Sequence, residues 1–129
     1  MGKAVGVGGV FLKAKDPKVL QAWYHANLGI PLSEYGMSVF EGPEAQGQTV
    51  FSFFPESTKN FGDPSQRAMI NFRVDSIDEV VAQLSEAGAK IDPKRDDSEY
   101  GRFAWFWDPE GNRVELWEPA AEETAPETA

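Results

Sequence analysis

The sequence contains no cysteine and a single histidine, His25, among its 129 residues. Without cysteine, the chain cannot form thiol nucleophiles, disulfide bonds, iron–sulfur clusters or thiolate zinc sites, and it is compatible with a reducing compartment. Long hydrophobic runs are also missing, since no apolar stretch approaches the ~18 residues of a membrane-spanning helix. The first residues lack the apolar stretch of a secretory signal. We therefore expect a cytoplasmic protein without a membrane anchor.

Basic residues are scarce, because 12 Lys and Arg stand against 21 Asp and Glu, which gives a net charge of −9. A chain this acidic repels phosphate backbones, so we expect no nucleic-acid partner. Part of the acidity lies at the C-terminal end, where residues 119–129 contain glutamates but no basic or large apolar residue. Such a segment cannot bury enough surface to order itself, and we predict a disordered acidic tail.

The remaining residues, 1–118, predict a single domain that contains an internal repeat. Residues 10–14 and 70–74 alternate apolar with other side chains, which is typical of β-strands. An aspartate follows each strand, Asp16 in the first copy and Asp75 in the second, and each is followed by apolar residues three or four apart. We predict two helices of equal length that begin at these aspartates and end at Gly29 and Gly88.

The repeat continues after each helix. Residues 33–36 and 98–101 both read S-E-Y-G, and each tetrad precedes a β-prone run, a turn and a last strand. These strands are predicted over residues 37–40 and 49–54 in the first copy and over 102–107 and 113–117 in the second. Each half therefore has the order β-α-β-β-β, with module one at about 5–54, a linker over 55–66 and module two at about 67–118. The glycine-rich residues 6–9 are interpreted as a flexible lead-in to the first strand.

The chain resembles the vicinal oxygen chelate superfamily, which includes glyoxalase I, bleomycin-resistance proteins and extradiol dioxygenases. The resemblance rests on D-P-E-G-N-R-V-E-L over residues 108–116, and on W-Y-x-x-x-L-G over residues 23–29. It implies an α+β fold in which two βαβββ modules form a curved, mixed, eight-stranded sheet around a cleft. It also implies a homodimer and a small-molecule ligand.

Metal-dependent members of that superfamily hold a divalent ion with His, Glu or Gln from four strands. The corresponding positions here fall on Gly9, on Ser52 or Phe51, on Met69 and on Glu115. Only Glu115 keeps a strong ligand, and a lone carboxylate binds a divalent ion weakly. We therefore predict no metal and no other cofactor. His25, in the first helix, and Glu56, in a loop, are interpreted as surface residues rather than as substitute ligands.

Strand alternation separates the side chains that face the predicted cleft from those that lie under the helices. The set predicted under the helices is apolar: Val10, Leu12, Ala14, Ile70, Phe72 and Val74. The other parity includes Gly9 and Lys13 and supplies most of the predicted ligand-binding residues. These are Phe11, Phe51, Ser52, Met69, Asn71, Arg73, Trp105, Arg113, Glu115 and Trp117, with Phe51 and Ser52 as alternatives for one register.

Two features of this face have two interpretations each. Trp105, Trp107 and Trp117 are either core or dimer-contact residues, as large aromatics usually are, or an aromatic wall for a planar or cationic ligand. Glu115 is either one half of a structural ion pair with Arg113, Arg73 or Lys13, or the polar anchor of an otherwise apolar pocket.

Three functions follow from these alternatives. The first is a small-molecule binder without metal that sequesters a planar or cationic compound, as bleomycin-resistance proteins do. The second is a metal-dependent glyoxalase- or dioxygenase-like enzyme, which the missing ligands disfavour. The third is metal-free catalysis with Glu115 as general base and Arg73 or Arg113 stabilising an oxyanion. The sequence favours the first, so we expect a binding protein rather than an enzyme.

Overall fold

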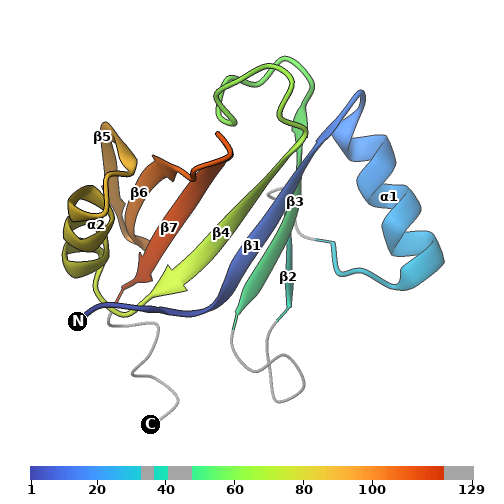
Figure 1. Ribbon diagram of the computed structural model, residues 1–129. Helices are drawn as coiled ribbons and strands as arrows, with labels where there is room; N and C mark the ends of the chain where they lie inside the picture. Colours follow the sequence, from blue (N-terminus) through green and yellow to red (C-terminus); the bar gives the residue numbers. More distant parts are fainter. Residues whose placement is uncertain (33–36, 41–47, 121–129) are drawn as a thin grey trace, which may run out of the picture. The chain divides into compact units, whose positions relative to one another are not determined.

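The computed structural model describes residues 1–32, 37–40 and 48–120. The first S-E-Y-G tetrad, the turn over residues 42–47 and most of the predicted tail lie outside the described residues. Within them, no helix is long and apolar enough to span a bilayer. The elements are β1 (Ala4–Ala14), α1 (Pro17–Leu28), β2 (Met37–Phe40), β3 (Thr49–Pro55), β4 (Ala68–Val74), α2 (Ile77–Glu86), β5 (Lys90–Ser98), β6 (Gly101–Trp107) and β7 (Arg113–Pro119) (Figure 1).

The fold is of the α+β class, as predicted, with seven strands in the described part of the chain. The strands follow the order β2-β3-β1-β4-β7-β6-β5, and the sheet is not closed. It is mixed, because β1 pairs with β3 and β4 with β7 in parallel, whereas β2–β3, β5–β6 and β6–β7 are antiparallel. The second repeat has the predicted order β-α-β-β-β, although its strand β5 lies outside the ranges predicted above, and the described residues of the first repeat have β-α-β-β.

The chain divides into two compact units. We call Gly8–Ile70 the N-terminal unit, and Met1–Val7 together with Asn71–Ala129 the C-terminal unit. The division crosses β1 and β4, so each unit contains part of both strands.

In the N-terminal unit, helix α1 forms where the sequence predicts it. The Asp16 side chain accepts a hydrogen bond from the Val19 amide, and Gly29 ends the helix with φ 67°, a left-handed conformation that glycine adopts without a Cβ penalty. The helix packs on β3 through Tyr24, whose ring lies 5.5 Å from that of Phe51 and 5.3 Å from that of Phe53.

Residues 55–66, predicted as a linker, contain a core side chain. Phe61 is 0% exposed, and its ring lies 5.4 Å from that of Phe54. The Lys13 ammonium lies 5.5 Å from the Phe61 ring and donates a hydrogen bond to the carbonyl of Pro64 at 2.9 Å. This segment is therefore anchored to the N-terminal unit by one aromatic side chain and one buried lysine.

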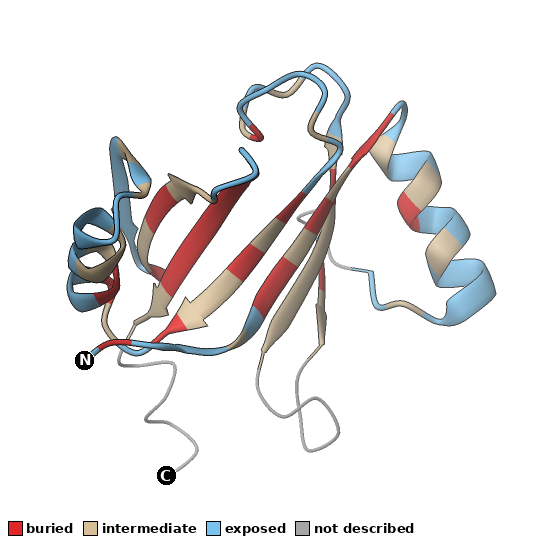
Figure 2. Cartoon of the chain, viewed as in Figure 1, coloured by how far each residue is buried: buried red, intermediate tan, exposed pale blue. Residues whose placement is uncertain are grey.

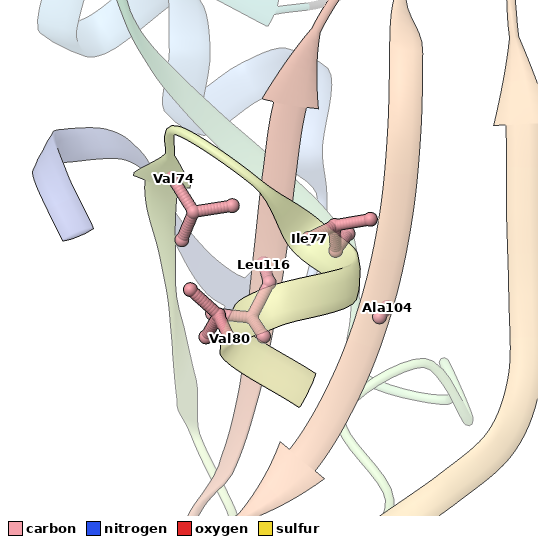
Figure 3. Packing of buried hydrophobic residues seen from close by; sticks show 5 residues of the cluster. All are labelled: Val74, Ile77, Val80, Ala104 and Leu116. Atoms are coloured by element: carbon pink, nitrogen blue, oxygen red, sulfur yellow. The ribbon is translucent and has the colours of Figure 1, made fainter. Parts of the chain in front are cut away.

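The C-terminal unit has its hydrophobic core between helix α2 and one face of the strands β4, β6 and β7. Five buried residues form the cluster: Val74, Ile77, Val80, Ala104 and Leu116 (Figure 3). Partly buried side chains, Phe72 among them, pack against it. The alternation that placed Phe72 and Val74 under the second helix is confirmed.

The observed helix α2 differs from the predicted one in two details. Its N-cap is Ser76, whose hydroxyl accepts a hydrogen bond from the Glu79 amide, and not Asp75. The Asp75 carboxylate instead accepts one from the Lys3 amide at 2.8 Å, so this aspartate joins the N-terminal strand to the start of the helix. The two helices also differ in length, with 12 residues in α1 and 10 in α2.

The glycine-rich residues 6–9 are part of β1, not a flexible lead-in. A close approach in the C-terminal unit explains the glycine at position 6. The Arg73 guanidinium lies against Gly6 where a Cβ would be, and its Nη1 donates to the carbonyl of Val7 at 3.0 Å. Glycine lets the arginine lie along the strand. The sequence also missed strand β5, whose highly charged residues lack the alternation of apolar side chains that marks the others.

Candidate functional site

In the C-terminal unit, the two faces of strands β6 and β7 carry different side chains. Residues directly opposite each other share a face, so the pairs Trp107↔Arg113, Trp105↔Glu115 and Phe103↔Trp117 lie opposite to the face that α2 covers. Figure 2 shows β7 buried over most of its length. The face away from α2 therefore combines aromatic rings with a buried arginine and a buried glutamate.

The Glu115 carboxyl is the most buried acidic group on this face, with 7% of the residue exposed. Asn71, its partner on the parallel strand β4, donates from Nδ2 to Oε1 at 2.6 Å. Trp105, its partner on β6, donates from Nε1 to Oε2 at 3.0 Å. We call these three residues the Glu115 site.

The carbonyl oxygen of the Asn71 amide has no hydrogen-bond partner in the described part of the chain. Asn71 is 2% exposed, and its Nδ2 is directed to Glu115. Buried polar atoms are nearly always hydrogen-bonded, because leaving one unpaired costs about 1–3 kcal/mol. The Glu115 site thus presents an acceptor that an N–H or O–H donor would satisfy.

Burial raises the pKa of the Glu115 carboxyl above its ordinary value, because a charge is poorly solvated there. The hydrogen bonds from Asn71 and Trp105 and the charges of Arg113 and Lys94 act in the opposite direction without cancelling the effect of burial. A carboxyl with a raised pKa can exchange a proton closer to neutral pH than an exposed glutamate can.

Three cationic side chains lie over the indole rings of this face. Lys94 Nζ lies 4.7 Å from the centroid of the Trp105 ring, and Lys90 Nζ lies 4.5 Å from that of Trp107. The Arg113 guanidinium lies 5.3 Å and 5.2 Å from the same two rings and pairs with Asp92 at 2.7 Å. The sequence predicted Arg113 here, but Lys90, Asp92 and Lys94 come from the unpredicted strand β5.

Arg73 and Trp117, also predicted on this face, have other partners. Arg73 lies along β1, as described above. The Trp117 ring stacks on that of Phe103 at 6.1 Å, and its Nε1 donates to the carbonyl of Tyr100 at 2.8 Å. Neither interaction reaches the Glu115 carboxyl, whose hydrogen-bond donors are Asn71 and Trp105.

The other predicted ligand-binding residues belong to the N-terminal unit. Phe11 is in register with Ser52, so these two share a face of the sheet, and the Phe11 ring contacts that of Phe54 at 5.5 Å. Phe51 lies on the opposite face, against Tyr24 of α1, which resolves the register that the sequence left open. Met69 is 1% exposed.

The donor chemistry at the superfamily's four metal positions does not fit a divalent ion. Gly9 has no side-chain donor, Ser52 offers only a neutral hydroxyl and Met69 only a soft thioether. Both oxygens of Glu115, the fourth residue, accept hydrogen bonds within the protein. Among residues 1–32, 37–40 and 48–120, no group of three or more His, Cys, Asp or Glu side chains is placed to hold a metal.

His25 and Glu56 lie on the surface of the N-terminal unit. His25 is exposed, with Nδ1 2.8 Å from the carbonyl of Ile30. Glu56 is exposed and pairs with Arg67 at 3.7 Å. Both positions agree with the interpretation as surface residues.

Two depressions of the surface lie elsewhere. One, of ≈ 630 Å³, adjoins Lys90 and Trp107 at the end of α2, and the other, of ≈ 520 Å³, lies beside Val19 and Trp23 of α1. Glu115 lines neither of them. The Glu115 site is therefore defined by its hydrogen bonds and burial.

The raised pKa of Glu115 predicts how stability depends on pH. The folded protein binds the Glu115 proton more tightly than the unfolded chain does, so this group stabilises the fold below the ordinary pKa of glutamate. The contribution is lost as the pH rises through the raised pKa. In Glu115→Gln this loss is absent. We therefore expect the free energy of unfolding of the variant to rise relative to that of wild type between pH 4 and pH 8.

Urea denaturation across that pH range measures the difference, with Glu110→Gln, at an exposed turn position, as the control. Aspartates with lowered pKa, such as Asp78 beside Arg102, act in a separate window, because the stability that they add is lost only as the pH falls below their unfolded value. Parallel curves for wild type and Glu115→Gln would contradict the assignment.

The chain belongs to the Glyoxalase-like domain family, whose sequence model matches residues 9–117. It is 26% identical over 118 residues to the uncharacterized protein YraH of Bacillus subtilis (strain 168), with 82% of this chain and 92% of that protein covered.

Solved structures share the fold. A Streptomyces coelicolor methylmalonyl-CoA epimerase variant in complex with 2-nitronate-propionyl-CoA superposes with a TM-score of 0.70 at 14% identity, covering 92% of this chain and 100% of that one. A glyoxalase/bleomycin resistance protein/dioxygenase superfamily member from Vibrio splendidus 12B01 gives a TM-score of 0.57 at 13% identity, over 92% of this chain and 99% of that one. The match to the Glyoxalase-like domain model confirms the resemblance to the vicinal oxygen chelate superfamily, and these structures share its fold.

Proposed function

We propose that this protein binds a small planar molecule at the Glu115 site without a metal ion. The observation that carries the proposal is the unpaired acceptor of Asn71 beside the buried Glu115 carboxyl. A ligand that offers an N–H or O–H group satisfies this acceptor, and the Trp105 indole, which is 3% exposed, holds the Glu115 carboxyl beside it through its Nε1. The epimerase neighbour with a bound CoA derivative supports a small-molecule ligand for this fold.

The structure favours a planar ligand over a cationic one. Indole faces attract cations, but Arg113 and Lys94 already lie over Trp105, and Lys90 lies over Trp107. A cationic ligand would have to displace these side chains against charge repulsion. The occupied indole faces thus count against the cationic half of the sequence-based hypothesis and leave its planar half.

The test is a thermal-shift and tryptophan-fluorescence titration in EDTA, with benzamide, nicotinamide, 2-pyridone and uracil as planar N–H donors. We expect saturable, one-to-one binding of at least one probe. Asn71→Leu removes the unpaired acceptor and should weaken binding about tenfold or more, since a lost hydrogen bond to a buried group costs about 1–3 kcal/mol.

Glu110→Gln, which alters an exposed turn carboxylate, is the control and should bind as wild type does. The proposal fails if none of the four probes binds, if binding requires an added metal, or if Asn71→Leu binds with unchanged affinity.

A second candidate is metal-free proton transfer with Glu115 as general base, which the raised pKa of its carboxyl favours. Incorporation of solvent deuterium into phenylacetamide, a carboxamide with exchangeable hydrogens on the carbon next to its carbonyl, followed by NMR, separates the two functions. Catalysis predicts exchange that Glu115→Gln abolishes while ligand affinity changes little. A binder predicts no exchange in either protein.

A further inference from the structure

Strand β5 contains a bulge opposite Trp105. Ile91 pairs with Phe106 and Arg95 with Ala104, so three residues of β5 stand opposite the single residue of β6 between those partners. These three are Asp92, Pro93 and Lys94. Bulges redirect side chains and are frequent beside functional sites. Here the bulge places two charged side chains of an edge strand on the face that carries Glu115.

The Asp92 carboxylate holds the bulge in place with both oxygens. Oδ1 accepts a hydrogen bond from the Lys94 amide at 2.9 Å, and Oδ2 accepts one from Arg113 at 2.7 Å. The first interaction lowers the pKa of Asp92 most, and the Arg113 pair lowers it further. Asp92 therefore remains ionised, and its charge is committed to Arg113 and to the bulge.

Lys90 and Lys94 retain free charge on this face. Both are exposed, and neither forms an ion pair within 4 Å with a carboxylate in the described part of the chain. Their ammonium groups lie over Trp107 and Trp105. The strand register also places Asp96, opposite Phe103, and Arg73, opposite Trp117, on this face. Four positive charges, those of Lys90, Lys94, Arg73 and Arg113, therefore stand against the three of Asp92, Asp96 and Glu115, on a chain whose net charge is −9. This face is a locally positive region of an acidic protein.

The unpaired Asn71 acceptor is an independent sign of a ligand at the same place. The Lys94 charge acts on the Glu115 carboxyl, and both residues contact Trp105. The arrangement therefore has acceptors at its buried end, an indole ring beside them and two exposed ammonium groups at its outer edge.

We propose that Lys94 and Lys90, presented by the bulged strand β5, recognise a negatively charged group on the ligand of the Glu115 site. The ligand class is then a planar anion, such as an aromatic carboxylate, with an N–H or O–H donor at its other end. The inference rests on the proposed function, because it assigns the part of the same site that recognises the charge of the ligand. It replaces the cationic ligand that the sequence suggested.

Three probes of one shape test the charge preference: 4-methylbenzamide, 4-carbamoylbenzoate and 4-amidinobenzamide. All three offer the same carboxamide N–H to Asn71 and Glu115. The opposite end is neutral in 4-methylbenzamide, anionic in 4-carbamoylbenzoate and cationic in 4-amidinobenzamide. We expect the anion to bind about tenfold more tightly than the neutral probe, and the cation to bind most weakly. The advantage of the anion should shrink as the salt concentration rises.

The Lys90→Gln/Lys94→Gln double variant should remove most of this advantage, so that the anionic and the neutral probe bind with similar affinity. Lys18→Gln/Lys59→Gln, two exposed lysines of the N-terminal unit, is the matched control for net charge. Equal affinity for all three probes, a preference for the cation, or an anion preference that survives the double variant would overturn the inference and leave the proposed function standing. Failure of all three probes to bind would overturn both.

Discussion

Replacing Phe61 with alanine is expected to lower the free energy of unfolding by about 3–5 kcal/mol, the cost of removing a fully buried phenylalanine from a core. Phe61 is 0% exposed, although it lies in a segment rich in turn-forming residues. Its ring contacts Phe54 and the Lys13 ammonium. The variant leaves a cavity and deprives a buried lysine of its aromatic neighbour. Urea denaturation followed by circular dichroism measures the loss.

Two further variants make this prediction specific to packing. Lys59→Ala changes an exposed residue two positions away and should alter stability by less than about 0.5 kcal/mol. Phe61→Leu keeps most of the buried apolar volume and should lose clearly less than Phe61→Ala. A loss below about 1 kcal/mol for Phe61→Ala would mean that residues 55–66 form a solvated linker, as the sequence alone suggests.

Asp92→Ala is expected to lower the free energy of unfolding by about 3 kcal/mol. The Arg113 side chain is only 6% exposed, and breaking a largely buried ion pair by removing its carboxylate is strongly destabilising. The same substitution removes the acceptor of the Lys94 amide, so the bulge in β5 loses its anchor.

A double-mutant cycle with Arg113→Met isolates the pair. The coupling between the two substitutions should exceed about 1 kcal/mol, as is usual for residues in direct contact. Asp96→Ala, an exposed aspartate of the same strand, is the control and should cost little. Additive effects of Asp92→Ala and Arg113→Met would show that the pair contributes no interaction energy.

Local signals in the sequence account for the helices and the core of the C-terminal unit. Asp16 and Gly29 mark the two ends of α1. A side-chain oxygen caps the free amides at the start of the helix, and a residue that can adopt positive φ ends it. Alternation placed Phe72 and Val74 under α2, because successive side chains of a strand point to opposite faces. The same rule placed Asn71 and Glu115 on the other face, where they form a hydrogen bond.

Other features depend on partners that are distant in the sequence. Asp75 and Ser76 are both good capping residues, and the Lys3 amide, which binds Asp75, leaves Ser76 to cap α2. Strand β5 has almost no apolar alternation, because it pairs at the sheet edge and is held by charged side chains. Neither result follows from propensity within a short window.

The order of the elements other than β5, the family and the acidic, cysteine-free character of the chain were determined by the sequence alone, because caps, periodicity and a nine-residue motif are local properties. Tertiary structure decided the chemistry of the Glu115 site. Only the pairing of β4, β6 and β7 gives Glu115 its two donors, and only the pairing of β5 with β6 brings Lys90 and Lys94 to the indole rings. Burial and charge are properties of the folded surroundings, and these depend on residues far apart in the chain.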